Sequence, residues 1–210
     1  MNAAVDQTRV PARGRIKGAA FREVVVWFER ELGQGPFFDA YDRLPPEMER
    51  GLFVSRPALG LLSGSWYEAE VVHALLDALT AEMGAAERRR VADTCATHVM
   101  STMLSGIYKM LFHLMASPET YLRYGPKLWD SFFDSGTFEL ERVSDTAACC
   151  TISRWESHHG FMCDLNRAAS AQIYRAMGCE DVTCTREACV TEGAPHCKFV
   201  TRWTGWTSPV

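Results

Sequence analysis

The sequence predicts an α+β fold, with a helical N-terminal part packed on a C-terminal β-β-α-β-β antiparallel sheet. Apolar residues recur at helical spacing up to Gly136, whereas alternating and β-branched strand patterns begin only after it. The chain has 210 residues, of which 47% are hydrophobic and 23% charged, as expected for a chain that buries one core. We therefore expect a flexible N-terminal arm over residues 1–15 and a single domain over residues 16–206.

Charge and apolar patterning argue against several classes of protein. The net charge of −4 argues against a broad nucleic-acid-binding surface, and a basic run near the N-terminus reads as a solvated arm. No secretory leader is visible, and no uninterrupted apolar run is long enough to cross a bilayer. We expect a cytoplasmic protein whose eight cysteines are reduced and form no disulfide framework.

The N-terminal part reads as a series of amphipathic helices. A first helix over residues 16–32 places its apolar side chains on one face and ends at Gly33. Another helix begins near Ser65, where Glu68, three residues later, completes a capping box. The longest periodic segment follows over residues 85–116.

The next helix has a strong start signal and an expected break. Ser117 is a preferred N-cap residue, and Pro118 suits the first helical position because its missing N–H would have no partner there. Gly125 and Pro126 are expected to interrupt this helix, which restarts after them.

The C-terminal part reads as two hairpins separated by a helix. Ser144 and Asp145 join the first pair of strands, and Glu192 and Gly193 join the second pair. The intervening helix ends at Gly178. The strands are expected over residues 137–143, 148–155, 181–190 and 196–203.

Three cysteines fall where these elements can bring them together. Cys163 lies in the first turns of the helix, Cys189 ends one strand of the final hairpin, and Cys197 begins the other. Thiolates arranged in this way suit zinc, which prefers four tetrahedral ligands. A redox pair and inert buried thiols are the alternatives, and inert burial is what we expect of four others. Those four are Cys95, Cys149, Cys150 and Cys179.

The block Cys163…Cys189-x3-Gly193-x3-Cys197-x-Phe199 resembles the 4-vinyl-reductase-type ligand-binding domain. That domain belongs to the superfamily of the TRAPP vesicle-tethering subunits and the haem-based nitric-oxide sensors. The N-terminal part is similar to uncharacterised paralogous proteins of myxobacteria. The resemblance implies that three cysteines and one glutamate hold a structural zinc beside a ligand pocket.

The fourth zinc ligand is where the chain departs from that pattern. The family's glutamate position is taken here by Arg186, so Glu187 or Cys184 would have to serve. Glu187 is favoured, because on an ideal strand it shares a face with Cys189. Loss of the metal is the other interpretation of Arg186. His158 and His159 stand at the start of the covering helix beside Cys163. A ligand role is one interpretation of them, and neutral surface imidazoles are the default, because a helix N-terminus disfavours an added positive charge.

A ligand pocket is expected between the long helix and the sheet. Aromatic residues gather there, and pockets of this kind are lined by apolar side chains with a few polar groups. The candidate ligand-binding residues are His98, Tyr108, Phe112, His113, Trp129, Phe133 and Trp155. Haem is not expected, because the Tyr-x-Ser-x-Arg signature of the haem-based sensors is absent.

These features predict a non-enzymatic module that binds or senses a small hydrophobic or aromatic molecule. The resemblance implies a homodimer, and the signal would pass through an unknown downstream protein. The first alternative is a dimeric protein–protein interaction scaffold like the TRAPP subunits. The second is an accessory protein of tetrapyrrole reduction, which ranks last because the sequence offers no phosphate-binding loop and no acid–base set.

Overall fold

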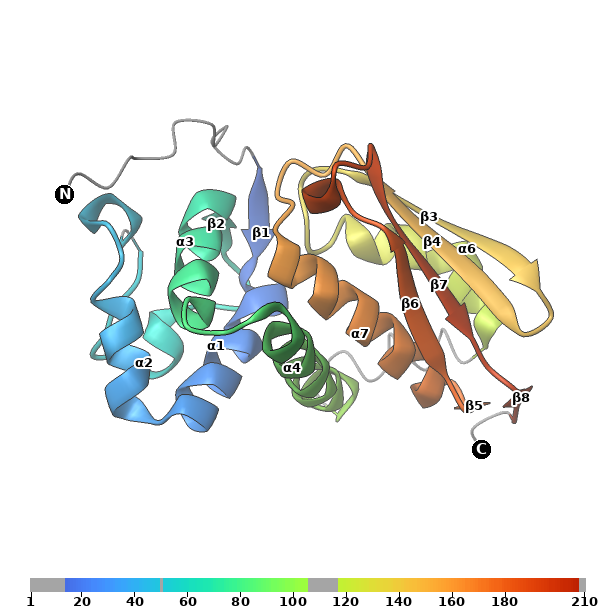
Figure 1. The fold of residues 1–210 in the computed structure, drawn as a ribbon, viewed down its shortest axis with the longest axis horizontal. Helices are drawn as coiled ribbons and strands as arrows, with labels where there is room; N and C mark the ends of the chain where they lie inside the picture. The colour runs from blue at the N-terminus through green and yellow to red at the C-terminus, as the bar shows by residue number, and fades with distance from the viewer. Residues whose placement is uncertain (1–13, 50, 106–116, 208–210) are drawn as a thin grey trace.

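The computed structural model describes residues 14–49, 51–105 and 117–207 of the chain. Helices of the N-terminal part stand beside an antiparallel sheet, and helices α4 and α7 lie against each other between the two (Figure 1). This arrangement confirms the predicted α+β class. None of the described helices is long and apolar enough to cross a membrane.

The N-terminal part begins with a short strand pair that the sequence did not reveal. Strand β1 pairs with β2, and this pairing delays the start of both following helices. The first helix therefore starts at Gly18. The predicted cap at Ser65 is wrong, because the helix begins only at Ala69. The elements are β1 (Arg15–Lys17), α1 (Gly18–Leu32), α2 (Gln34–Tyr41), η1 (Pro46–Met48), η2 (Pro57–Gly60), β2 (Trp66–Glu68), α3 (Ala69–Thr80) and α4 (Ala85–Ser105).

Helix α6 (Pro118–Trp129) confirms its predicted start and contradicts its predicted break. The Ser117 side chain accepts a hydrogen bond from the Thr120 backbone N–H, as an N-cap does. The helix continues through Gly125 and Pro126. Gly125 is there for close packing, because a Cβ at this position would lie 2.5 Å from Leu140 Cδ1.

The C-terminal part has the predicted β-β-α-β-β order. Its main sheet is antiparallel throughout, with the spatial order β3-β4-β7-β6. The strands and helices are β3 (Thr137–Ser144), β4 (Ala147–Ser153), α7 (Gly160–Ala176), β5 (Cys179–Glu180), β6 (Thr183–Ala188), η3 (Val190–Glu192), β7 (His196–Arg202) and β8 (Gly205–Trp206). The short strands β5 and β8 pair with each other beside the main sheet.

One face of the sheet forms part of the core. Ile152 lies opposite Cys197 across the β4–β7 pair, and Cys150 lies opposite Phe199. These four side chains are buried. Because side chains alternate along a strand, they point to the same face, which helices α6 and α7 cover.

Candidate metal centre and ligand cavity

The final hairpin and helix α7 bring three thiols together from distant parts of the sequence. Cys163 lies in the first turn of α7, Cys189 directly follows β6, and Cys197 is the second residue of β7. All three are completely buried. His158 lies in the segment that leads from β4 into α7, and its imidazole completes the group.

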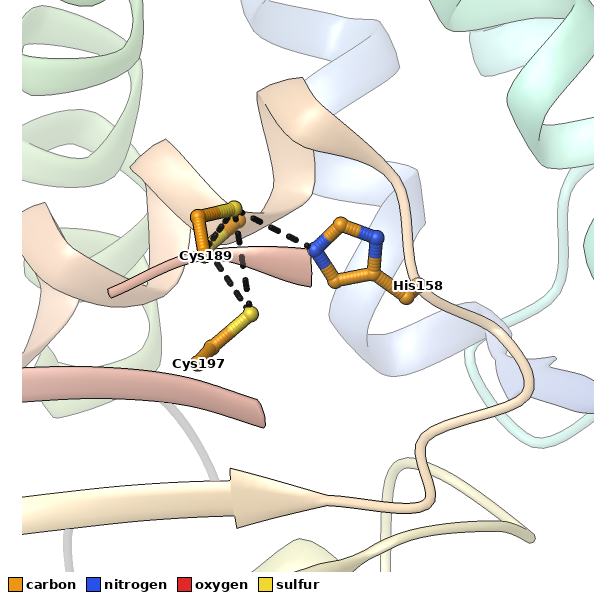
Figure 2. A group of neighbouring side chains, drawn as sticks. His158, Cys189 and Cys197 are labelled. Carbon is orange, nitrogen blue, oxygen red and sulfur yellow. Dashed lines mark hydrogen bonds between the residues drawn. The ribbon is translucent and has the colours of Figure 1, made fainter. Parts of the chain in front are cut away.

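The four donor atoms lie within 4.8 Å of one another, and their sulfur–sulfur distances and one sulfur–nitrogen distance are close to those around one tetrahedral metal ion. The Sγ atom of Cys163 lies 3.5 Å from that of Cys197 and 3.4 Å from that of Cys189, and the latter two are 3.8 Å apart. Cys189 Sγ is also 3.6 Å from His158 Nε2 (Figure 2). A tetrahedral zinc with Zn–S bonds of about 2.3 Å and a Zn–N bond of about 2.05 Å separates two sulfurs by about 3.8 Å, and a sulfur from a nitrogen by about 3.6 Å.

The same distances argue against a disulfide within the cluster. A disulfide joins two sulfurs at about 2.05 Å, well below every sulfur–sulfur distance here. All eight cysteines of the chain are free. Cys95, Cys149, Cys150 and Cys179 are buried, as expected.

Electrostatics within the cluster favour the thiolate form of Cys197 and the protonated form of Cys163. The pKa of Cys197 is lowered to about 4, chiefly because the Cys163 thiol donates a hydrogen bond to it; burial opposes the shift, and His158 and the Val190 backbone reinforce it. The pKa of Cys163 is raised by the same hydrogen bond, by burial and by the charge of Cys197. Binding a cation would draw the remaining protons off, because the thiolate is the form that binds metal.

Neither residue expected as the fourth ligand reaches this group. Glu187 falls in a β-bulge of β6, where the register against β7 shifts, and a bulge breaks the alternation on which its prediction rested. Its carboxylate lies 3.1 Å from Lys198 Nζ and 3.8 Å from the Arg202 guanidinium. The Cys184 sulfur accepts a hydrogen bond from Thr201 Oγ1 at 3.3 Å.

The histidine pair before α7 has two separate structural tasks. His159 is the N-cap residue of α7, where its Nδ1 accepts from the Phe161 backbone N–H, and its Nε2 lies 3.0 Å from Asp77 Oδ1. His158 instead turns its ring toward the thiols. The sequence feature that points to His158 as a ligand is its position five residues before Cys163, just before the helix that carries this thiol.

An apolar cavity of about 150 Å³ lies between the helices and the core face of the sheet. Residues from α1, α4, α6, α7, β3, β4 and β7 contribute to its wall. Asn166 and Ser170 are polar members of this wall, and both already donate to carbonyls of their own helix, at Met162 and Asn166. The wall includes Val24, Val99, Met100, Met103, Tyr121, Leu128, Trp129, Phe133, Phe138, Cys150, Ile152, Met162, Leu165, Ala169, Ile173 and Phe199.

The candidate ligand-binding residues divide into four groups. Trp129 and Phe133 line the cavity. Trp155 packs against both of them, with ring centroids 5.0 and 5.2 Å away, but is not part of the wall. His98 lies elsewhere, with its Nδ1 3.4 Å from the Arg30 guanidinium. The remaining candidates, Tyr108, Phe112 and His113, lie outside the described residues.

The thiol cluster and the cavity are built on the same two elements. On α7, Met162 lines the cavity and the next residue, Cys163, belongs to the cluster. On β7, Cys197 belongs to the cluster and Phe199 lines the cavity from the same face. A shift of α7 or β7 would therefore move side chains of both the thiol cluster and the cavity wall.

No family model and no curated protein matches the chain. Solved structures do match it over most of its length. The Fe(II) unliganded H-NOX protein from K. algicida is 14% identical, with 90% of this chain and 97% of that chain covered and a TM-score of 0.65. An H-NOX protein from S. oneidensis in the Fe(II)NO ligation state is 11% identical, with 90% and 100% covered and a TM-score of 0.60.

A likeness at such low identity concerns the backbone arrangement alone. The placement in a superfamily that contains nitric-oxide sensors and the resemblance to the 4-vinyl-reductase-type domain both stay predictions. The described part of the chain has the fold of H-NOX proteins.

Proposed function

We propose that this protein is a sensor domain that binds a small apolar or single-ring aromatic molecule in the cavity beside α7. The observation that carries the proposal is the cavity itself, whose wall is apolar apart from a few polar side chains. An apolar cavity of about 150 Å³ is large enough to hold benzene. Sites for drug-sized ligands are larger, at roughly 300–1,000 Å³.

The fold supports a sensory role over the alternatives. The similar H-NOX structures include an Fe(II) unliganded state and a state with NO bound to Fe(II). The same arrangement of elements thus accommodates small molecules in other proteins. A dimeric interaction scaffold and an accessory role in tetrapyrrole reduction remain the alternatives.

The proposal includes a structural zinc held by Cys163, Cys189, Cys197 and His158. The donor set fits the ion, because three soft sulfurs and one imidazole nitrogen are close to tetrahedral spacing. Zinc would cross-link β7 and the end of β6 to the start of α7, and so fix the elements that line one side of the cavity. No position would remain for a water molecule, which is the mark of a structural site.

Haem is the alternative cofactor to which the similar structures point. The described wall of the cavity does not suit it, because it contains no histidine to bind the iron and no Arg or Lys to pair with propionates. Reconstitution with hemin tests this, and we expect no stoichiometric Soret band; a band that is lost in His113→Ala would establish haem instead.

The decisive experiment observes the methionine methyl groups by NMR. Met100, Met103 and Met162 line the cavity, whereas Met48 in η1 does not. Titration of benzene or phenol into protein labelled with [13C-methyl]methionine should shift the first three signals in a saturable way and leave Met48 unchanged. Uniform or unsaturable shifts would contradict the proposal.

Native mass spectrometry of the reduced protein reports zinc, retained ligand and oligomeric state together. We expect one zinc per chain and a homodimer. A metal-free chain that is folded and was never exposed to chelator would overturn the zinc assignment. It would favour the interaction scaffold.

A further inference from the structure

Arg186 lies beside the candidate metal centre, although it cannot bind a cation itself. It belongs to β6, three residues before Cys189. Its side chain is only 13% exposed, which is unusual for an arginine. The guanidinium lies 3.0 Å from Asp164 Oδ1 and 2.5 Å from Glu192 Oε1. A buried charge with these partners has a defined position.

The sulfurs of the cluster contribute to the environment of this guanidinium. Burial works against its charge, yet Asp164, the Cys189 and Cys163 sulfurs, and Glu192 together raise the pKa of Arg186. Its two carboxylate partners also flank the thiols, since Asp164 follows Cys163 directly and Glu192 lies in η3 after Cys189. Arg186 is thus held by carboxylates of residues close in sequence to two of the cluster's cysteines, and it lines the same surface pocket as His158.

A count of charges shows why a cation belongs at this place. Three thiolates and a neutral imidazole around a divalent ion leave a net charge of −1, in a site whose sulfurs are completely buried. An uncompensated buried charge is costly, and a nearby opposite charge offsets part of that cost. Thr191 adds a neutral contact, because its Oγ1 lies 3.0 Å from Cys189 Sγ.

We propose that Arg186 is the counter-charge of the metal centre, which increases its affinity for a divalent ion and keeps its thiolates bound and unreactive. This inference rests on the proposed zinc site. The proposed counter-charge role accounts for an arginine at the position where the resembled family has a glutamate. In this chain the fourth ligand is supplied by His158 instead, and the position in β6 is free to carry a cation.

The competing explanation is that Arg186 only holds elements together. It belongs to a chain of alternating charges that runs from Glu192 through Arg186 and Asp164 to Arg167 and Asp93, which joins η3, β6, α7 and α4. Arg167 is a matched control. Its side chain is 14% exposed and belongs to the same chain of charges, but its guanidinium contacts Asp93 and the Cys184 carbonyl rather than the cluster.

The experiment measures zinc affinity by chelator competition in Arg186→Gln, Arg186→Lys, Arg167→Gln and Glu192→Gln. We expect Arg186→Gln to weaken binding by about tenfold or more, as is typical when a group that supports metal ligands is lost. Arg186→Lys keeps the charge and should keep most of the affinity. Glu192→Gln removes a carboxylate that competes with the thiolates for the Arg186 guanidinium, so zinc affinity should not fall. If Arg186 only holds elements together, loss of this ion pair should lower zinc affinity.

Two readouts that do not depend on affinity complete the test. The sulfur-to-cobalt charge-transfer band of the Co²⁺-loaded protein should shift in Arg186→Gln and not in Arg167→Gln. Iodoacetamide should alkylate the zinc-loaded thiolates faster in Arg186→Gln alone. Equal effects of the two arginine variants, or no effect of Arg186→Gln, would overturn the inference while leaving the zinc site standing. A wild-type protein that binds no zinc would overturn the metal centre first, and the inference with it.

Discussion

Cys189 Sγ and His158 Nε2 lie 3.6 Å apart, although 31 residues separate them in the sequence. This distance is the sulfur–nitrogen edge of a tetrahedral zinc site, about 3.6 Å for bonds of ordinary length. The proposed zinc site therefore takes the His158 imidazole as its fourth ligand, in place of the carboxylate in β6.

Replacement of His158 should weaken metal binding, and replacement of Glu187 should not. We expect His158→Ala to lower zinc affinity at least tenfold, because one of four bonds is lost, and Glu187→Gln to match the wild type, because its carboxylate pairs with Lys198. The d–d spectrum of the Co²⁺-loaded proteins is the measurement. Loss of the tetrahedral spectrum in Glu187→Gln alone would restore the original ligand prediction.

The thiols of the cluster should matter far more for stability than other buried thiols. Cys189 and Cys95 are both completely buried, so alanine removes the same group from similar surroundings. We expect Cys95→Ala to cost about 1 kcal/mol of unfolding free energy, and Cys189→Ala to cost about 3 kcal/mol or more, because folding is coupled to metal binding.

Urea unfolding with and without chelator measures both variants. The chelator should destabilise the wild type and Cys95→Ala, but have little further effect on Cys189→Ala. Equal small losses in the two variants, both insensitive to chelator, would make the cluster a set of packing residues.

Filling the cavity should abolish ligand binding without unfolding the protein. Ala169 lines the cavity from α7, whereas Ala176, at the end of the same helix, is exposed. Ala169→Leu should eliminate the benzene-dependent methionine shifts, because the added atoms occupy the ligand's space, and Ala176→Leu should retain them. Unchanged binding in Ala169→Leu would place the ligand elsewhere.

The cap of α6 offers a test of a purely local prediction. Ser117→Ala removes the side-chain acceptor of the Thr120 N–H and should cost about 1 kcal/mol. Ser131→Ala removes an exposed hydroxyl that bonds to the Lys127 carbonyl at 3.4 Å, and should be nearly neutral. Thermal unfolding compares the two. A change in zinc affinity in either variant would show an unexpected link between α6 and the cluster.

Local patterns of the sequence determined the α+β class, the two hairpins and the thiols that meet. Strand alternation and turn residues act over a few positions, so the meeting of Cys189 with Cys197 could be predicted from the chain. The helix between the hairpins must cover the sheet, and this brought Cys163 to the same place. The cap at Ser117 was equally local, and it was predicted correctly.

Only the tertiary structure decided the features that depend on distant partners. The bulge of β6 at Glu187 arises from pairing with β7, and it removes that side chain from the face that strict alternation would give it. The pairing of β1 with β2 moved the start of α3 from Ser65 to Ala69. The same holds for His158, which reaches the thiols through the path of a loop, and for the cavity, because apolar periodicity describes a filled core and an open pocket alike.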